Sequence, residues 1–296
     1  MLSFKAENLR MVRSIGKRAI LARLLEHSSS GSGRPVVVKR VEAQKAEMDL
    51  RPVKKHLQLL HGLKHYNFVK VIGALDDGSY NSQFLTSYLV EYMPQGSLRN
   101  ILASIPETSV DQATLLSSLT QIAAGMAYLE STKMVHGQLS CHNCYVDADG
   151  AVKVGEFGVR WEHEGSAVRW MSWESALEGS FSTASDVWSF GVCGWEVYSL
   201  CAQLPYNDLD EEGVFENLKS LHLNGELKVV KLPMIRVKLH VRVQKPLSMP
   251  SHCPSEQFYR KVLSPCWRRN SENRPSFAEL HLLLQKLSIS NKAIEE

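Results

Sequence analysis

Residues 136–146 read His-Gly-Gln-Leu-Ser-Cys-His-Asn-Cys-Tyr-Val, and after a short turn residues 152–158 read Val-Lys-Val-Gly-Glu-Phe-Gly. The two strings place polar side chains, His136, Gln138, Asn143 and Glu156, on either side of a predicted hairpin. Gln138 is an amide without useful basicity near pH 7, but it can accept a hydrogen bond and orient a hydroxyl group. The reactions that the chain could catalyse depend on these four residues.

The residues before this stretch predict a β-rich region. Residues 8–40 are predicted to be rich in strands, and individual strands are predicted at residues 20–25, 35–41, 69–74 and 84–92, of which 35–41 is β-branched and typical of a buried strand. The apolar face of Val53, Leu57, Leu60 and Leu63 predicts one helix, which begins at Pro52.

The residues beyond a predicted hinge at 93–97 predict helices. A 3.6-residue apolar period predicts a helix over 111–132, and the nearly uniform apolar character of 187–200 indicates a core helix. An amphipathic helix is predicted over 277–287. The order is therefore a small β-rich region, a hinge and a larger helical region.

Composition limits the classes of function. The length of 296 residues suits one two-lobed domain or two small domains, and the net charge of +3 is too weak to indicate a nucleic-acid partner. No apolar run approaches the roughly 18–20 residues that span a bilayer, and residues 1–7 lack the apolar stretch of a signal peptide. We expect no membrane segment in this chain.

The opening stretch resembles the active-site pattern of protein kinases, in which H-R-D-L-x-x-x-N is followed by D-F-G. His136, Leu139, Asn143, Phe157 and Gly158 match that pattern. Gly137 replaces the loop arginine, Gln138 replaces the catalytic aspartate and Glu156 replaces the metal-binding aspartate.

Further strings match the tyrosine-kinase branch in the right order. They are Val38-Lys39, residues 63–69, Val90-Glu91-Tyr92-Met93, residues 169–175, residues 185–191, Cys266-Trp267 and residues 274–277. The chain therefore resembles this branch over about residues 8–289. The resemblance implies an α+β, protein-kinase-like two-lobed fold, with a β-rich N-lobe at 1–92, a hinge at 93–97, a helical C-lobe at 98–289 that contains an insert near 228–246, and a tail at 290–296.

The resemblance also implies roles for individual residues. The nucleotide-binding candidates are Lys39, Glu91, Met93, Asn143 and Glu156, and Asn143 and Glu156 are also the Mg²⁺ candidates. Glu174 and Arg274 are expected to form an ion pair inside the C-lobe. Asp186 is expected to accept hydrogen bonds from the main chain of the catalytic loop.

The substitutions predict impaired phosphoryl transfer, which depends on positioning and charge neutralisation. Gln138 stands where the general base belongs, and loss of such a base typically costs about 10²–10⁴ in rate. The extra methylene of Glu156 moves its carboxylate by about 1 Å, enough to cost about 10²-fold where geometry matters. Mg²⁺ could still be held, because it usually needs only one or two carboxylates and phosphate oxygens.

Three other regions are also degraded relative to the family pattern. The helix glutamate that pairs with Lys39 is replaced by His56, unless the register slips toward Glu42 or Glu47. Only Gly16 remains of the glycine-rich loop, where Lys17 and Arg18 are either phosphate contacts or solvated charges. The activation segment from Glu156 to Glu174 has 19 residues and no tyrosine.

Residues 229–245 interrupt the family pattern, and within them residues 235–244 alternate strictly between apolar and mostly basic residues, as in a half-buried strand. They carry five basic residues and no acid. They are either a docking strand for an acidic surface, a surface hairpin or translated non-coding sequence.

The sequence predicts a pseudokinase whose function is conformational. It resembles both the pseudokinase domains of Janus kinases and receptor tyrosine kinases with their inactive members. We expect a protein signalling partner, for example an active kinase, ATP with Mg²⁺ bound weakly or not at all, and a cytoplasmic location, either free or as the intracellular part of a membrane receptor. The alternatives are a weakly active ATP-dependent kinase and a zinc-dependent protein that uses Cys141, His142 and Cys144.

Overall fold

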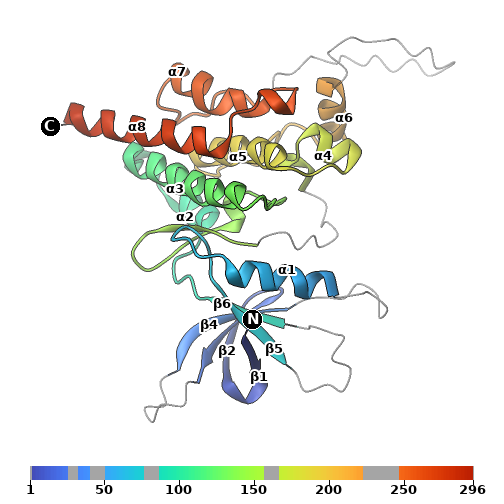
Figure 1. The fold of residues 1–296 in the computed structure, drawn as a ribbon. Coiled ribbons are helices and arrows are strands. Elements are labelled where there is room, and N and C mark those ends of the chain that lie inside the picture. Colours follow the sequence, from blue (N-terminus) through green and yellow to red (C-terminus); the bar gives the residue numbers. More distant parts are fainter. Residues whose placement is uncertain are drawn as a thin grey trace. The chain divides into compact units, whose positions relative to one another are not determined.

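Contacts divide the chain into two units. The computed structural model describes residues 2–25, 33–40, 51–76, 87–156, 167–222 and 247–295. The first unit comprises Met1–Gly96 and Tyr145–Val159, and the second comprises Ser97–Cys144 and Arg160–Glu296. The first unit is rich in strands and the second in helices (Figure 1).

The first unit contains a six-stranded sheet in the order β1-β5-β6-β4-β3-β2. Its strands are β1 (Leu2–Lys5), β2 (Leu9–Gly16), β3 (Ala19–Leu24), β4 (Arg34–Arg40), β5 (Val71–Asp76) and β6 (Ser87–Glu91). β1 pairs parallel with β5, and the other strands pair antiparallel. β1 is an addition to the predicted strands.

A buried apolar core holds the sheet together. Its members are Leu9, Ala22, Leu24, Val36, Val38, Ile72 and Leu89. Val36 and Val38 alternate with Lys39 and Val37 along β4, so this strand presents the lysine and the core valines on opposite faces. The single helix predicted here is α1 (Arg51–Gly62), which buries Leu57 and Leu60 and packs near β5.

The remnant of the glycine-rich loop is a tight hairpin. Gly16 pairs with Ala19, so only Lys17 and Arg18 form the turn between β2 and β3. The carbonyl of Arg18 accepts a 2.9 Å hydrogen bond from the main-chain N–H of Arg40. This turn is shorter than the loop that the family pattern implies.

The second unit is built on α5 (Thr183–Tyr198), in which every residue from Ser185 to Tyr198 is buried, as predicted for a core helix. A capping box formed by Ser182 and Ser185 begins the helix. The predicted helix at 111–132 is α3 (Gln112–Ser131), capped by the Asp111 carboxylate. It packs against α8.

α8 runs from Phe277 to Glu295, beyond the predicted end at 287, because no proline or glycine stops the helix. The remaining helices are α2 (Leu98–Ser104), α4 (Trp173–Glu178), α6 (Glu211–His222) and α7 (Glu256–Phe258), and the short strands are β7 (Gly96–Ser97), β8 (Cys144–Val146) and β9 (Val152–Val154). No helix among the described residues is long and apolar enough to cross a bilayer.

Several predictions lie outside the described residues. They concern the insert near 228–246, Phe157 and Gly158, the activation segment through Ser166, Glu42, Glu47 and the side chain of His56.

Candidate functional site

The predicted site residues divide between the two units. Lys39 lies on β4, Glu91 ends β6, Met93 follows β6 and Glu156 follows β9, all in the first unit. Gln138 and Asn143 belong to the second unit.

Lys39 and Glu156 form an ion pair although 117 positions separate them. Their side chains are only 19% and 22% exposed, so solvent screens the pair incompletely. The Tyr145 hydroxyl donates a 3.0 Å hydrogen bond to the same Glu156 oxygen, Oε1, and the Lys39 ammonium lies 5.5 Å from the Tyr145 ring centroid. The carboxylate expected to hold a metal is thus engaged by a cation and a hydroxyl.

Tyr145 is a member of this site that the sequence did not reveal. It lies on β8, which pairs with β9 and thereby brings its ring beside the residues that follow β9. A Cβ on Gly155 would lie 3.1 Å from both the Tyr145 ring and Val69, so glycine makes room for the tyrosine. In the sequence, the only signal that Tyr145 belongs to this site was its position two residues after Asn143.

Glu156 has a left-handed backbone, with φ of 60°. Such a conformation costs a residue with a side chain roughly 1–2 kcal/mol and often marks a functional position. Burial, followed by the Glu156 charge, raises the pKa of Tyr88 well above its usual value. The backbone conformation and the hydrogen bond from Tyr145 hold Glu156 in a defined orientation.

The two hinge candidates have partners within the first unit. The Glu91 carboxylate accepts hydrogen bonds from the Lys70 N–H at 2.8 Å and from the Lys153 ammonium at 3.1 Å. Met93 is buried, and its carbonyl accepts the Gly96 N–H at 3.1 Å. The side chain of Glu91 therefore supports the strands around it.

The catalytic-loop residues of the second unit are organised by Asp186. Its carboxylate accepts the main-chain N–H groups of His136 and Gly137, each at 2.7 Å, which confirms the expected role. Burial raises the pKa of Asp186 to about 7, although these hydrogen bonds act to lower it. Gly137 has φ of 76°, a conformation that glycine adopts without the strain of a Cβ.

The loop also holds Gln138 by its main chain. The Gln138 N–H donates to His136 Nδ1 at 3.1 Å, and its carbonyl accepts the Asn143 side-chain amide at 2.7 Å. The structure thus brings Gln138 and Asn143 together, as it does Lys39 and Glu156.

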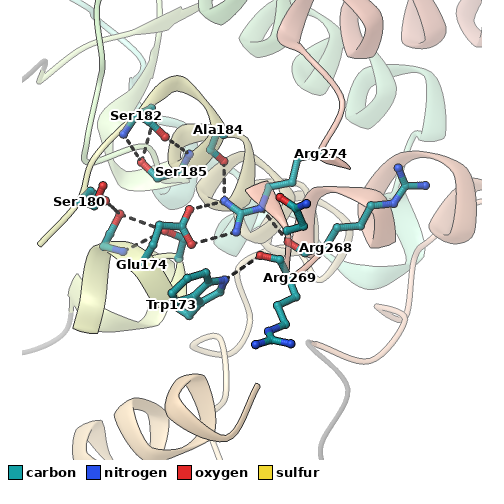
Figure 2. A network of polar contacts seen from close by, with 12 residues as sticks. Trp173, Glu174, Ser180, Ser182, Ala184, Ser185, Arg268, Arg269 and Arg274 are labelled. Atoms are coloured by element: carbon teal, nitrogen blue, oxygen red, sulfur yellow. Dashed lines mark hydrogen bonds and ion pairs between the residues drawn. The ribbon is translucent and has the colours of Figure 1, made fainter. Parts of the chain in front are cut away.

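The predicted ion pair between Glu174 and Arg274 is confirmed (Figure 2). Two hydrogen bonds of 2.5 and 2.9 Å join the guanidinium to the carboxylate. The Arg274 side chain is fully buried, and it also donates to the carbonyls of Ala184 and Arg268 at 2.9 Å. This network connects α4, the start of α5 and the segment before α8.

The chain matches a known protein family over a range that includes residues of both units. Residues 17–284 match the family model of protein tyrosine and serine/threonine kinases. The chain therefore belongs to this family, and its β-rich first part and helical second part are those of the two-lobed kinase fold.

The similar proteins are receptor tyrosine kinases. The chain is 38% identical to discoidin domain-containing receptor tyrosine kinase B of Caenorhabditis elegans over 265 residues, which is 86% of this chain and 30% of that protein. It is 31% identical to epithelial discoidin domain-containing receptor 1 of Rattus norvegicus over 78% of this chain and 26% of that protein. It is 31% identical to the transmembrane receptor Ror of Drosophila melanogaster over 83% of this chain and 33% of that protein. The chain thus spans about a third or less of the length of these relatives.

Proposed function

We propose that the chain is a catalytically impaired tyrosine-kinase-like domain that acts as a signalling scaffold or allosteric regulator and binds ATP weakly or not at all. The ion pair between Lys39 and Glu156 carries this proposal. Mg²⁺-ATP would need Lys39 for its phosphates and Glu156 for its metal, but each side chain already neutralises the other. Nucleotide binding must therefore disrupt this pair and the hydrogen bond from Tyr145.

Gln138 supports the same proposal on chemical grounds. A kinase transfers phosphate by positioning the reactants and by accepting the proton of the attacking hydroxyl. The amide of Gln138 cannot take up that proton near pH 7, and the missing base reduces the rate by about 10²–10⁴-fold.

If a nucleotide binds, we propose that Lys39 contacts its phosphates and that the main chain of Glu91 and Met93 contacts its base. The Glu91 carboxylate is less suited to this task, because Lys70 and Lys153 engage it. Glu156 is a proposed ligand of Mg²⁺, which prefers oxygen donors. Asn143 is proposed as a Mg²⁺ ligand on the family resemblance alone.

A weakly active kinase is the second candidate, and the order of the catalytic loop favours it. Asp186 holds the loop main chain with two hydrogen bonds, and Asn143 is positioned by the carbonyl of Gln138. The framework that supports catalysis in the family is therefore present without its base.

Thermal-shift and phosphate-transfer measurements on the purified chain separate the two candidates. We expect little or no stabilisation by ATP with Mg²⁺, and no transfer. Transfer that disappears in Lys39→Ala would overturn the proposal. The double variant Gln138→Asp with Glu156→Asp restores both family carboxylates, and a gain of transfer in it would show that these two positions limit catalysis.

We further propose that the domain acts on a protein signalling partner, such as an active kinase. Because two of the similar proteins are named as receptor and tyrosine kinase, we propose that the domain lies in the cytoplasm as the intracellular part of a membrane receptor. Co-purification of the domain with an active receptor kinase, and a change in the rate of that kinase, would test this role.

A further inference from the structure

Four of the six cysteines lie buried close together in the second unit. Cys141 lies in the 3₁₀ turn Cys141–Asn143, Cys144 begins β8, Cys193 lies on α5 and Cys201 follows α5. The Sγ atoms of Cys141 and Cys193 are 3.5 Å apart. Two thiols therefore meet in the interior of the second unit.

A buried carboxylate shares this location. Glu196 lies one turn after Cys193 on α5 and is 2% exposed. Its Oε2 atom accepts the Cys141 N–H and the Trp170 indole N–H, each at 2.9 Å. One donor atom from each of Cys141, Glu196 and Cys201 lies within 4.8 Å of the other two. Among the described residues, this is the group that could hold a metal ion.

We propose that the cluster is a zinc site with Cys141, Cys201 and Glu196 as its protein ligands. Tetrahedral Zn²⁺ with Zn–S bonds of about 2.3 Å places two sulfurs about 3.8 Å apart. The donor atoms of the three ligands lie within 4.8 Å of one another, so a movement of about 1 Å or less brings the two sulfurs to this spacing. Thiolate ligands select zinc over Mg²⁺ and Ca²⁺, which prefer oxygen. His142 is exposed, so the site differs from the one that the Cys-His-Asn-Cys string predicted.

Charge and outer contacts agree with this assignment. Two thiolates and one carboxylate give zinc the same formal charge as an established structural site with three cysteines and one histidine. Zinc would displace the thiol protons to solvent. The N–H donors of Cys141 and Trp170 would orient the ligating carboxylate.

The backbone turns Cys201 toward the cluster. Leu200 and Cys201 both have left-handed backbones, with φ of 53° and 50°, and the Cys201 N–H donates to the Glu196 carbonyl at 2.8 Å. A zinc ion held here would join the catalytic loop to α5 at a second point, beyond Asp186. This role does not depend on ATP or on phosphate transfer.

Metal analysis of the whole, tag-free, reduced chain tests the site. After exposure to Zn²⁺ and desalting, we expect stoichiometric zinc and a higher midpoint of thermal unfolding, which a chelator reverses. Co²⁺ in place of zinc should give thiolate charge-transfer absorption. Cys201→Ser and Glu196→Gln should lose the metal. Cys266→Ser is the matched control, because Cys266 is also buried but donates to the Val262 carbonyl outside the cluster.

A positioning variant adds a second readout. Trp170→Phe keeps all three protein ligands but removes one donor to Glu196, so we expect zinc affinity to fall by about 10–100-fold. The proposal fails if the wild-type chain holds no zinc and shows no cobalt–thiolate band. This result does not depend on whether the cysteine variants fold. It also fails if Cys201→Ser retains the metal, or if peptide mapping of the native chain finds Cys141 and Cys193 joined as a disulfide.

Discussion

Removal of the charge of Glu174 should destabilise the second unit strongly. Glu174→Gln keeps the shape of the side chain, but it leaves the fully buried Arg274 guanidinium without its counter-ion. Breaking a buried ion pair by neutralising one partner costs roughly 3–5 kcal/mol. Arg274 would keep its bonds to the carbonyls of Ala184 and Arg268 and its place 5.1 Å from the Trp188 ring. We therefore expect the lower end of that range, about 3 kcal/mol, or roughly a 100-fold loss in the folded-to-unfolded ratio.

Chemical denaturation followed by tryptophan fluorescence measures this loss. All six tryptophans lie between residues 161 and 267, so the signal reports on the second unit. Glu216→Gln is the matched control, because it also removes one acid, here from an exposed ion pair with Lys219. Exposed pairs contribute at most about 1 kcal/mol. A Glu174→Gln variant no less stable than Glu216→Gln would refute the argument.

Three further variants probe other contacts. Tyr145→Phe removes a hydrogen bond from Glu156, so the thermal shift with Mg²⁺-ATP should rise; an unchanged shift would mean that the tyrosine does not compete with the metal. The pKa of Asp186 is raised to about 7, so the folded state binds this proton more tightly than the unfolded state does. The free energy of unfolding should therefore fall by up to about 1.4 kcal/mol per pH unit as the pH rises from about 4 through 7. Denaturation across this pH range should show a flatter slope in Asp186→Asn, and equal slopes would contradict the shift. Gly191→Ala places a Cβ 2.7 Å from that of Cys266, and denaturation should show a loss of about 1–3 kcal/mol from overpacking, whereas a gain would indicate that the core yields.

The long periodic segments were predictable from the sequence because burial on one face fixes their pattern. The helix predicted over 111–132 and the core helix near 187–200 correspond to α3 and α5. The ion pair of Glu174 with Arg274, 100 positions apart, followed from the family resemblance and not from any local pattern. β1 was missed because its four residues are mostly exposed and carry no clear alternation.

The site was less predictable, because its contacts depend on tertiary packing. The sequence indicated that Lys39 lacks a glutamate at position 56, but it did not indicate that Glu156 would pair with Lys39 instead. Tyr145 joins that pair through the packing of β8 on β9. Similarly, Cys193 and Cys201 come near Cys141 only after α5 packs beside the loop, so the Cys-His-Asn-Cys string gave no sign of these neighbours.

In the second unit, α5 holds the catalytic loop through main-chain contacts that do not involve the side chain at position 138. α5 supplies two carboxylates to that loop: Asp186 binds the main chain of His136 and Gly137, and Glu196 binds the N–H of Cys141. Because these contacts use main-chain atoms, they do not require an aspartate at position 138. The loop can therefore keep its conformation when its general base is replaced, which is the condition that a kinase fold must meet to serve as a binding surface without catalysis.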